Sequence, residues 1–359
     1  MKILIEGRQS IGGLERYTQN LIRLLSSELT DDEIMIFGQS AAAHPADTRQ
    51  RGAVRAALGD FRRVFTEQYL IPRDARGRQA ALFHSTNYFV PRRLSIPCVA
   101  TCHDLWLLDH LREKKPGWTK HYERWQLCDG LRRADHVIAV SNTVARAIET
   151  RFGYGPEQIT VVYPPICDLG DVEIADIAPV SEGKRFFLAV GTLEPRKNFD
   201  CVLEGHRLAY RECGIPLYLA GAYGWNQEAL VRRIKESRGA ARWLGGVPDS
   251  TLAALYRQAV ALIAFGRDEG FDYPSVEALS FGTPVILSDI PVHREIVGHP
   301  GLYAPPDEPE ALGRSMLEAA AMSAPDRAKF REAARERIGA LRRRGSARRY
   351  REIYRRVVG

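Results

Sequence analysis

Two adjacent cations, Arg196 and Lys197, stand in the run Gly191–Asn198, directly after a short apolar segment. A glycine at this point is typical of the end of a buried strand, and parallel sheets bind ligands beyond the carboxyl ends of their strands. Arginine offers a phosphate two parallel hydrogen bonds, and lysine offers it a point charge. The pair therefore predicts a phosphate site, with a solvated basic turn as the alternative.

Two carboxylates, Glu269 and Glu277, flank a short segment that contains Pro274. Proline favours the first positions of a helix, so Glu277 is expected in a first turn. Carboxylate oxygens accept hydrogen bonds, which suits them to sugar and ribose hydroxyls at the edge of a sheet. For either residue alone, charge complementation at a helix N-terminus is the alternative.

Gly12 and Gly13 follow the first apolar run and open an amphipathic stretch. Glycine lets the backbone approach a ligand closely, and a helix N-terminus favours negative charge. The pair predicts either a second phosphate contact or a simple tight turn. His103, at the end of another apolar run, is a candidate for chemistry or a structural histidine.

Twelve short apolar runs must position these residues, and longer amphipathic stretches lie between many of them. Strands that alternate with helices predict parallel sheets covered on both faces. Two sets of about six strands predict an α/β protein of two doubly wound domains. The expected strands are Ile3–Glu6, Glu33–Phe37, Ala81–His84, Cys98–His103, His136–Val140, Thr160–Val162, Arg185–Val190, Pro216–Ala220, Ala241–Leu244, Val260–Phe265, Pro284–Ser288 and Leu302–Ala304. The polar stretch 162–182, with Pro164 and Pro165, is expected to link the two sets.

Composition excludes several classes of protein. The chain has 359 residues, of which 45% are hydrophobic and 26% charged, so it is neither disordered nor fibrous. Its longest clearly apolar run, Ala259–Phe265, is too short to span a membrane, and the N-terminus lacks a signal-peptide layout. We therefore expect a cytoplasmic protein. Six cysteines without a C-x-x-C pair predict reduced thiols and no zinc site.

The net charge is +7, and it is unevenly distributed. Residues 331–359 hold eleven arginines against three glutamates. Either this segment is a solvated basic helix, or it attracts an anionic surface. Because no basic motif is interleaved with aromatic residues, a membrane surface is favoured over nucleic acid.

In combination, these motifs resemble family four of the retaining glycosyltransferases, which have the GT-B fold. The resemblance covers nearly the whole chain in the family's order, and it rests on Gly12–Tyr17, His103-Asp104, Val140-Ser141, Gly191–Asn198, Leu244–Asp249, the E-x7-E pattern of Glu269 and Glu277, and Gly282-Thr283-Pro284. It implies two facing Rossmann-like domains with a nucleotide-sugar donor in the cleft between them. It also implies an acceptor domain over 1–170, a donor domain over 171–340, and an Arg-rich helix over 341–359 that returns to the first domain.

The resemblance implies a role for each candidate residue. Arg196 and Lys197, beside Thr192, would neutralise the departing diphosphate without a metal ion, and no cofactor is implied. Of the other residues, Gly12 and Gly13 would add backbone N–H groups. Glu269 and the amides of Phe271, Asp272 and Tyr273 would hold the sugar hydroxyls of the donor. Glu277 would hold the ribose, Val247 would border the base, and His103 would lie at the reaction centre.

Asp272 departs from the family's usual pattern, since many members read E-G-F-G where this chain reads Glu269-Gly270-Phe271-Asp272. The aspartate would either approach the sugar or constrain the loop. The variant, together with Leu287–His293, resembles mannosyltransferases of bacterial surface polysaccharides. It implies GDP-mannose as donor, with a UDP-sugar or another GDP-sugar as alternatives.

The same resemblance implies a glycan or lipid-linked oligosaccharide acceptor at the inner face of the cytoplasmic membrane. Aromatic residues near lysines, in the segment 105–125, are either an acceptor or lipid-interface patch or an inward-packed helix. They are Trp106, Trp118, Tyr122 and Trp125, beside Lys114, Lys115 and Lys120. A nicotinamide oxidoreductase is the first rival, but Gly7–Gly13 lacks the G-x-G-x-x-G spacing. A non-catalytic binding module is the second.

Overall fold

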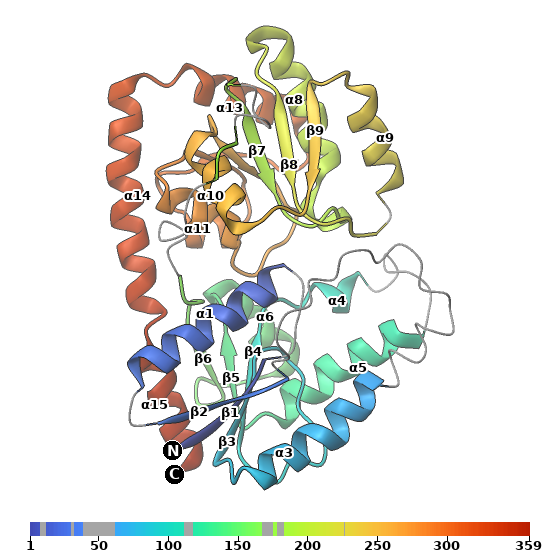
Figure 1. Cartoon of the computed structure of the whole chain (residues 1–359), viewed down its shortest axis with the longest axis vertical. Coiled ribbons are helices and arrows are strands. Elements are labelled where there is room, and N and C mark those ends of the chain that lie inside the picture. The colour runs from blue at the N-terminus through green and yellow to red at the C-terminus, as the bar shows by residue number, and fades with distance from the viewer. Residues whose placement is uncertain are drawn as a thin grey trace. The chain divides into compact units, whose positions relative to one another are not determined.

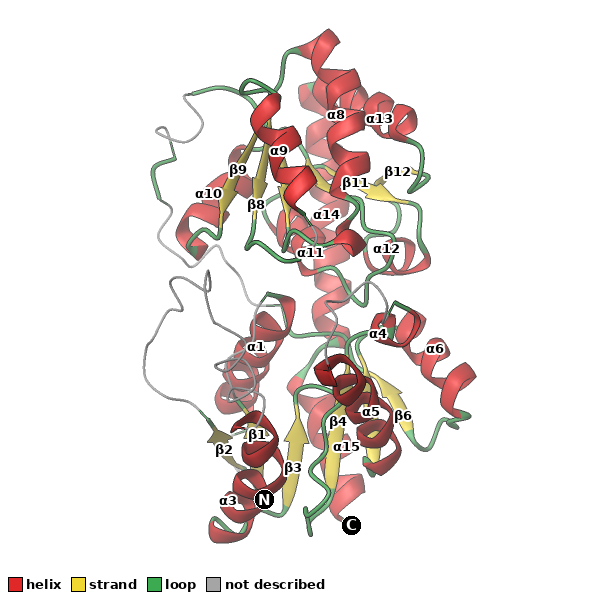
Figure 2. Ribbon diagram, turned by 90° about the vertical axis from the view of Figure 1, so that its right-hand side faces the viewer, coloured by secondary structure: helices red, strands yellow, loops and turns green. Residues whose placement is uncertain are grey.

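The chain folds into two compact units, Met1–Pro165 together with Arg344–Gly359, and Ile166–Arg343. The structure is a computed structural model, and it describes residues 1–7, 12–29, 32–38, 62–110, 118–166, 175–177, 183–225 and 227–359, without the side chains of 118–120. Each unit is built on one six-stranded sheet in which every neighbouring pair of strands is parallel (Figures 1 and 2). The expected α/β class and its two parallel sheets are confirmed.

The sheet of the first unit has the order β2-β1-β3-β4-β5-β6. Its strands are β1 (Lys2–Glu6), β2 (Glu33–Phe37), β3 (Leu82–Ser85), β4 (Cys98–Cys102), β5 (His136–Ala139) and β6 (Ile159–Val161). The direction in which successive strands are added reverses between β1 and β3. In doubly wound sheets this is where a crevice opens beyond the carboxyl ends of the strands.

Helices cover both faces of this sheet. They are α1 (Gly13–Glu28), α3 (Ile71–Gly77), α4 (Trp106–Asp109), α5 (Trp118–Arg133), α6 (Asn142–Phe152) and α15 (Ala347–Val358). One face carries Phe83 and Cys98, which share a core with Ile71 of α3. Successive strand residues point to opposite faces, so His84 and Thr101 face the other way, where α1 and α15 pack (Figure 1).

Helix α15 owes its place to one apolar stripe. Its buried residues, Ala347, Tyr350, Ile353 and Tyr354, recur at helical spacing, and its arginines occupy the other positions. Such spacing places the buried residues on one side of the helix. The basic C-terminal segment is therefore a packed element of the first unit.

The sheet of the second unit has the order β12-β11-β10-β7-β8-β9. Its strands are β7 (Phe187–Val190), β8 (Leu217–Ala220), β9 (Ala241–Gly245), β10 (Leu262–Ala264), β11 (Val285–Ser288) and β12 (Leu302–Ala304). Chain order runs outward in both directions from the adjacent strands β7 and β10, which is the Rossmann order. The switch point of this unit lies between those two strands.

The helices of the second unit are α8 (Phe199–Cys213), α9 (Glu228–Glu236), α10 (Asp249–Gln258), α11 (Tyr273–Ser280), α12 (Pro291–Ile296), α13 (Pro309–Ala321) and α14 (Ala324–Arg344). Apolar residues of α8, α9 and α13 share one core with the strands. Gly205 of α8 is where α13 approaches most closely, because a Cβ there would lie 2.9 Å from the Leu312 side chain. Figure 2 shows α8 and α13 side by side.

Among the described cysteines, Cys98, Cys102, Cys128, Cys201 and Cys213 are free thiols. Cys167, Lys114 and Lys115 lie outside the described residues. No helix in the described ranges is long and apolar enough to cross a membrane.

Candidate functional site

The strongest candidate residues follow β7 and β10, the two strands at the switch point of the second unit. Arg196 and Lys197 lie in the connection from β7 to α8, and Glu269 lies in the connection from β10 to α11. They are 72 positions apart in the chain, but parallel neighbouring strands bring their carboxyl ends to the same edge. The sheet topology thus assembles the site that the sequence motifs predict.

Two glycines allow the connection after β7 to turn at the sheet edge. Gly191 and Gly221 both have φ near +150°, and a Cβ on Gly221 would lie only 2.0 Å from the Gly191 carbonyl oxygen. The chain then forms a 3₁₀ turn over Pro195–Lys197. Asn198 adopts a left-handed conformation, and its Nδ2 donates to the Pro306 carbonyl at 2.7 Å. These restraints fix the backbone that carries both cations.

Glu269 bridges the two cations. Its Oε2 accepts from Arg196 Nη1 at 2.8 Å and its Oε1 from Lys197 Nζ at 2.6 Å. Arg196 also donates to the Asp268 carbonyl at 2.9 Å and to Glu194 Oε1 at 3.0 Å. The Glu269 side chain is 7% exposed and those of Arg196 and Lys197 are 16% and 15% exposed. The three charges are held rigidly but keep a narrow opening to solvent.

Burial raises the pKa of the Glu269 carboxyl, but the charges of Arg196 and Lys197 outweigh it and hold that pKa below its ordinary value. Glu269 is therefore an acceptor of hydrogen bonds at neutral pH. A ligand phosphate near the cations would share their N–H groups with this carboxylate. The arrangement can bind an anion and can stabilise negative charge that develops on it.

The loop after Glu269 is closely packed. The rings of Phe271 and Tyr273 meet edge to face with centroids 5.5 Å apart, and both are buried. Asp272 between them has φ 65°, and its carboxylate accepts from Ser275 and lies 3.4 Å from His293 Nε2. Of the two alternatives for Asp272, the structure favours a constraint on the loop.

Glu277 lies on α11, which begins at Tyr273 with Pro274 at its second position, so Glu277 follows the first turn in which it was expected. Its Oε2 accepts from the Tyr256 hydroxyl of α10 at 2.9 Å. Both side chains are buried. Tyr256 is thus a firm partner of Glu277 within the protein. A carboxylate has two oxygens with several acceptor positions, so it retains capacity for a ligand hydroxyl.

Thr192 lies directly after β7, and Val247 lies in the connection from β9 to α10. Both are half-buried. They belong to the carboxyl edge of the same sheet as Arg196 and Lys197, but Val247 follows the edge strand β9, two strands away from β7.

In the first unit, Gly12 and Gly13 follow β1, a strand at the switch point of that sheet. Gly12 has φ 72° and precedes α1, while both residues are exposed. His103 follows β4, and its Nε2 donates to the Thr86 carbonyl at 2.9 Å. Burial lowers the pKa of His103, so the ring is neutral at pH 7. Its other nitrogen is then an acceptor.

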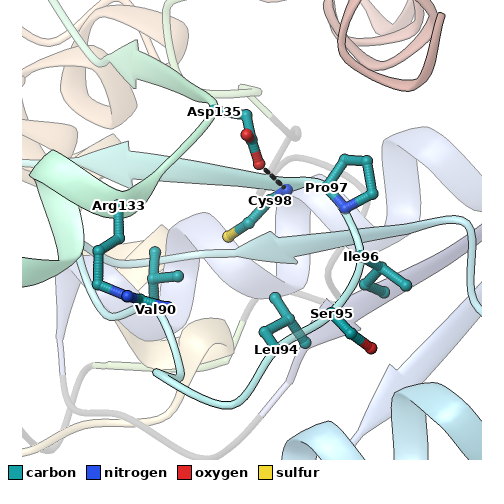
Figure 3. A pocket seen from close by; sticks show the side chains of 8 residues that line it. All are labelled: Val90, Leu94, Ser95, Ile96, Pro97, Cys98, Arg133 and Asp135. Carbon is teal, nitrogen blue, oxygen red and sulfur yellow. Dashed lines mark hydrogen bonds between the residues drawn. The ribbon is translucent and has the colours of Figure 1, made fainter.

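The hollow drawn in Figure 3 is not at either carboxyl edge. It measures about 410 Å³ and lies in the first unit, where Cys98 begins β4 and Asp135 precedes β5. Asp135 Oδ2 accepts from the Cys98 backbone N–H at 2.8 Å. The hollow is lined by Val90, Leu94, Ser95, Ile96, Pro97, Cys98, Arg133 and Asp135, none of them a predicted site residue.

The structure thus brings Arg196, Lys197, Glu269 and Asp272 together in one ionic cluster, and it adds Glu194 and His293, neither of which was predicted as a site residue. Glu194 was in the motif Gly191–Asn198 and could have been suspected from its place beside Arg196. His293 ends the segment Leu287–His293, but its contact with Asp272 has no local signal, because Asp272 lies 21 positions earlier. In the described ranges no three His, Cys, Asp or Glu side chains are grouped as metal ligands.

Two family models match consecutive parts of the chain. Residues 11–168 match Glycosyltransferase Family 4, and residues 172–337 match Glycosyl transferases group 1. The division between the matches falls close to the passage of the chain from the first unit to the second.

Relatives of known name are similar to much of the chain. O-antigen chain mannosyltransferase B of Escherichia coli is 28% identical over 330 residues, which cover 85% of this chain and 86% of that protein. O-antigen chain mannosyltransferase RfbU of Salmonella typhimurium strain LT2 is 31% identical over 190 residues, 53% of this chain and 52% of that protein.

Solved structures share the fold along the whole chain. Sucrose-phosphate synthase from Thermosynechococcus elongatus has a TM-score of 0.70 at 19% identity, covering 99% of this chain and 98% of that one. WaaG, described as a glycosyltransferase involved in lipopolysaccharide biosynthesis, has a TM-score of 0.67 at 14% identity, with 99% of each chain covered. Anabaena HepE in complex with UDP has a TM-score of 0.65 at 18% identity, covering 97% and 96%.

Proposed function

Because this chain belongs to the glycosyltransferases, with the GT-B fold and mannosyltransferase relatives, we propose that it transfers mannose from GDP-mannose with retention of configuration. The proposed acceptor is a glycan or lipid-linked oligosaccharide of bacterial polysaccharide assembly. The observation that carries the proposal is the cluster of Arg196, Lys197 and Glu269 at the switch point of the second unit. The printed names of the relatives support the choice of mannose.

The proposed reaction breaks the bond between the anomeric carbon and a phosphate oxygen, and the bonding electrons stay with the departing GDP. Arg196 and Lys197 would neutralise that new charge, which stabilises the transition state more than the ground state. The acceptor hydroxyl would attack the same face of the sugar and transfer its proton to the departing phosphate oxygen. Two positive charges can serve the diphosphate without a divalent ion, so we propose a reaction independent of metals and cofactors.

Other residues would position the donor. Glu269 and the amides of Phe271, Asp272 and Tyr273 would hold the sugar hydroxyls, while Glu277 would accept from the ribose and Val247 would border the base. Gly12, Gly13 and His103 would complete the site from the first unit, with His103 as a neutral hydrogen-bonding group.

Thermal stabilisation tests the donor first. GDP-mannose should raise the melting temperature of the purified protein with or without a chelator, because a ligand that binds only the folded state stabilises it by mass action. A shift with a UDP-sugar or another GDP-sugar would keep the chemistry and replace the donor. A transfer assay with labelled donor, followed by NMR of the anomeric linkage, tests retention. Hydride transfer, or binding without transfer to any glycan acceptor, would contradict the proposal.

We also propose peripheral association with anionic membranes from the cytoplasmic side. Phe65, Tyr69 and Trp125 of the first unit are 45%, 46% and 38% exposed, although large apolar side chains are usually buried. Arg93 lies 4.4 Å from the centroid of the Tyr69 ring, and Arg92 lies 4.6 Å from that of Trp125. Exposed aromatic rings beside arginines suit the interface of an anionic bilayer.

Of the aromatic residues in the segment 105–125, Trp106 is buried and stacks on His110, whereas Trp125 is exposed. Sedimentation with vesicles of anionic lipid tests the membrane proposal, and vesicles of neutral lipid are the control. Y69S together with W125S should reduce binding to anionic vesicles, and unchanged binding would contradict a role for this patch.

A further inference from the structure

Asp272 occupies a backbone conformation that is unusual for its side chain. It has φ 65° and ψ 71°, in the left-handed region where glycine is free of strain and other residues are uncommon. Such a residue persists only where its surroundings hold it, and it is often found at functional sites. Its side chain is 2% exposed, so the surroundings of the carboxylate are protein groups.

The partner of Asp272 is His293 on α12, and its side chain is completely buried. The His293 Nδ1–H donates to the Ser288 carbonyl at 2.8 Å, which fixes that proton on Nδ1. Nε2 faces Asp272 Oδ2 at 3.4 Å and carries a second proton only when the ring is charged. Ser288 Oγ in turn donates to the Gly266 carbonyl at the start of the loop that leads to Glu269.

Electrostatics favour the charged form of both partners. Burial alone lowers the pKa of His293, but the hydrogen bond and the charge of Asp272, with the charge of Glu269, raise it above its ordinary value. Burial raises the pKa of Asp272, but His293, Lys197 and Ser275 bring it below its ordinary value. Each partner therefore favours the charged form of the other, an imidazolium beside a carboxylate.

We propose that Asp272 and His293 are positioning residues that form a charged clasp on the loop 269–273, and that this clasp sets donor-sugar binding. The inference rests on the proposed function, because the loop amides are taken to hold the sugar. Glu269 anchors one end of the loop to Arg196 and Lys197, and Asp272 anchors the other end to α12. Both anchors must hold for the amides between them to keep one geometry.

The test compares D272N, H293Q and the double variant D272N/H293Q. Asparagine tolerates the left-handed conformation, so D272N changes the charge and not the backbone preference. Each single variant leaves a buried side chain without its partner. We expect each to lower kcat/KM for the donor at least about tenfold, mainly through a higher KM. The double variant should be no worse than the worse single variant, since coupled residues are not additive.

A matched control is D289N. It breaks the exposed ion pair between Asp289 and Arg294, which lies next to His293 on α12. Kinetic constants of D289N should equal those of the wild type. The pH profile of kcat/KM adds a readout that packing alone would not move. Activity that depends on the charged clasp falls as the pH rises through the pKa of His293, and in D272N this fall should occur at lower pH.

Amide hydrogen exchange over residues 270–273, without any donor, separates the clasp from the proposed function. We expect faster exchange in D272N and in H293Q than in the wild type and D289N. Faster exchange in a protein that transfers no sugar would keep the clasp and overturn the proposed function. Wild-type exchange in both single variants, or kinetic effects that multiply in the double variant, would overturn the clasp. D272G, which relieves the backbone strain, serves as a second variant should D272N fold poorly.

Discussion

At the residue scale, the central feature is that Arg196 and Lys197 are already paired with Glu269. Charges this deeply placed are costly to leave without partners, so each one holds the others in position. The cations are therefore preorganised, and a bound phosphate would meet them without first ordering flexible side chains. This distinguishes the site from a solvated basic turn.

Lys197→Met tests the contribution of the charge at Lys197. Methionine retains most of the apolar stem, which lies against Gly191, and removes only the ammonium group. We expect kcat for sugar transfer to fall at least about tenfold, roughly 1.4 kcal/mol of barrier. Arg267→Met is the matched control, because Arg267 follows the neighbouring strand β10 at the same sheet edge but pairs with the exposed Asp307. Equal kcat values in the two variants would remove the diphosphate role.

Glu277→Ala tests the proposed ribose contact. The substitution removes a hydrogen-bond acceptor from a ribose hydroxyl, so we expect the Kd for GDP to rise about tenfold or more, as measured by calorimetry. Tyr256→Phe is the companion variant, because it removes the hydrogen bond from the Tyr256 hydroxyl to Glu277 and leaves the Glu277 side chain in place. If GDP binds Glu277→Ala as tightly as the wild type, Glu277 has only a structural role.

Sequence analysis found Arg196, Lys197, Glu269 and Glu277 because each lies in a short motif. The partners that hold Glu277 and Asp272 could not be found in this way. Tyr256 bonds Glu277 across 21 positions, and His293 faces Asp272 across the same separation. Nothing in a local pattern reports such pairs, since they depend on which helices the fold brings together.

At the scale of elements, all twelve expected strands are present, with their ends shifted by at most a few residues. Buried parallel strands are nearly continuous apolar runs, so a run such as Pro284–Ser288 is detected directly. The order of the strands within each sheet cannot be predicted in this way, because an apolar run does not indicate which strand lies beside it. That β7 lies beside β10, which assembles the ionic cluster, came from the structure.

Gly221→Ala tests how β8 and β7 are held at the site edge. A Cβ there would meet the Gly191 carbonyl oxygen at 2.0 Å, and φ is also unfavourable for alanine. We expect the free energy of unfolding to fall by about 3 kcal/mol in urea denaturation. Gly214→Ala is the control: its φ is +63° with open space around it, so only backbone strain of about 1 kcal/mol applies. Similar losses in both variants would show that close approach at Gly221 is unimportant.

At the scale of the whole molecule, the chain leaves the first unit at Pro165 and returns to it at Arg344. Helix α15 completes a buried polar cluster there. The Tyr354 hydroxyl lies 2.6 Å from His84 Nδ1, and Thr101 Oγ1 lies 2.9 Å from His84 Nε2. The arginines of 341–359 suggested a solvated basic helix or an anionic partner, whereas Ala347, Tyr350, Ile353 and Tyr354, at helical spacing, form a buried face.

The pH dependence of stability tests the docking of α15 through His84. Burial, and next the charge of His103, lower the pKa of His84 to about 3, against an unfolded value near 6.5. Below pH 6.5 His84 binds a proton in the unfolded chain but stays neutral in the folded chain. Stability is therefore lost as the pH falls from 6.5 towards 3.

His84 should contribute at most about 1.4 kcal/mol per pH unit to this loss, and His84→Gln should flatten the curve by that amount in urea denaturation at several pH values. The slope is the relevant quantity, because the substitution also changes the absolute stability. His299→Gln is the control, since His299 is exposed and should leave the slope unchanged. Equal slopes in the wild type and His84→Gln would mean that His84 is accessible to protons in the folded protein, and that α15 does not seal this cluster.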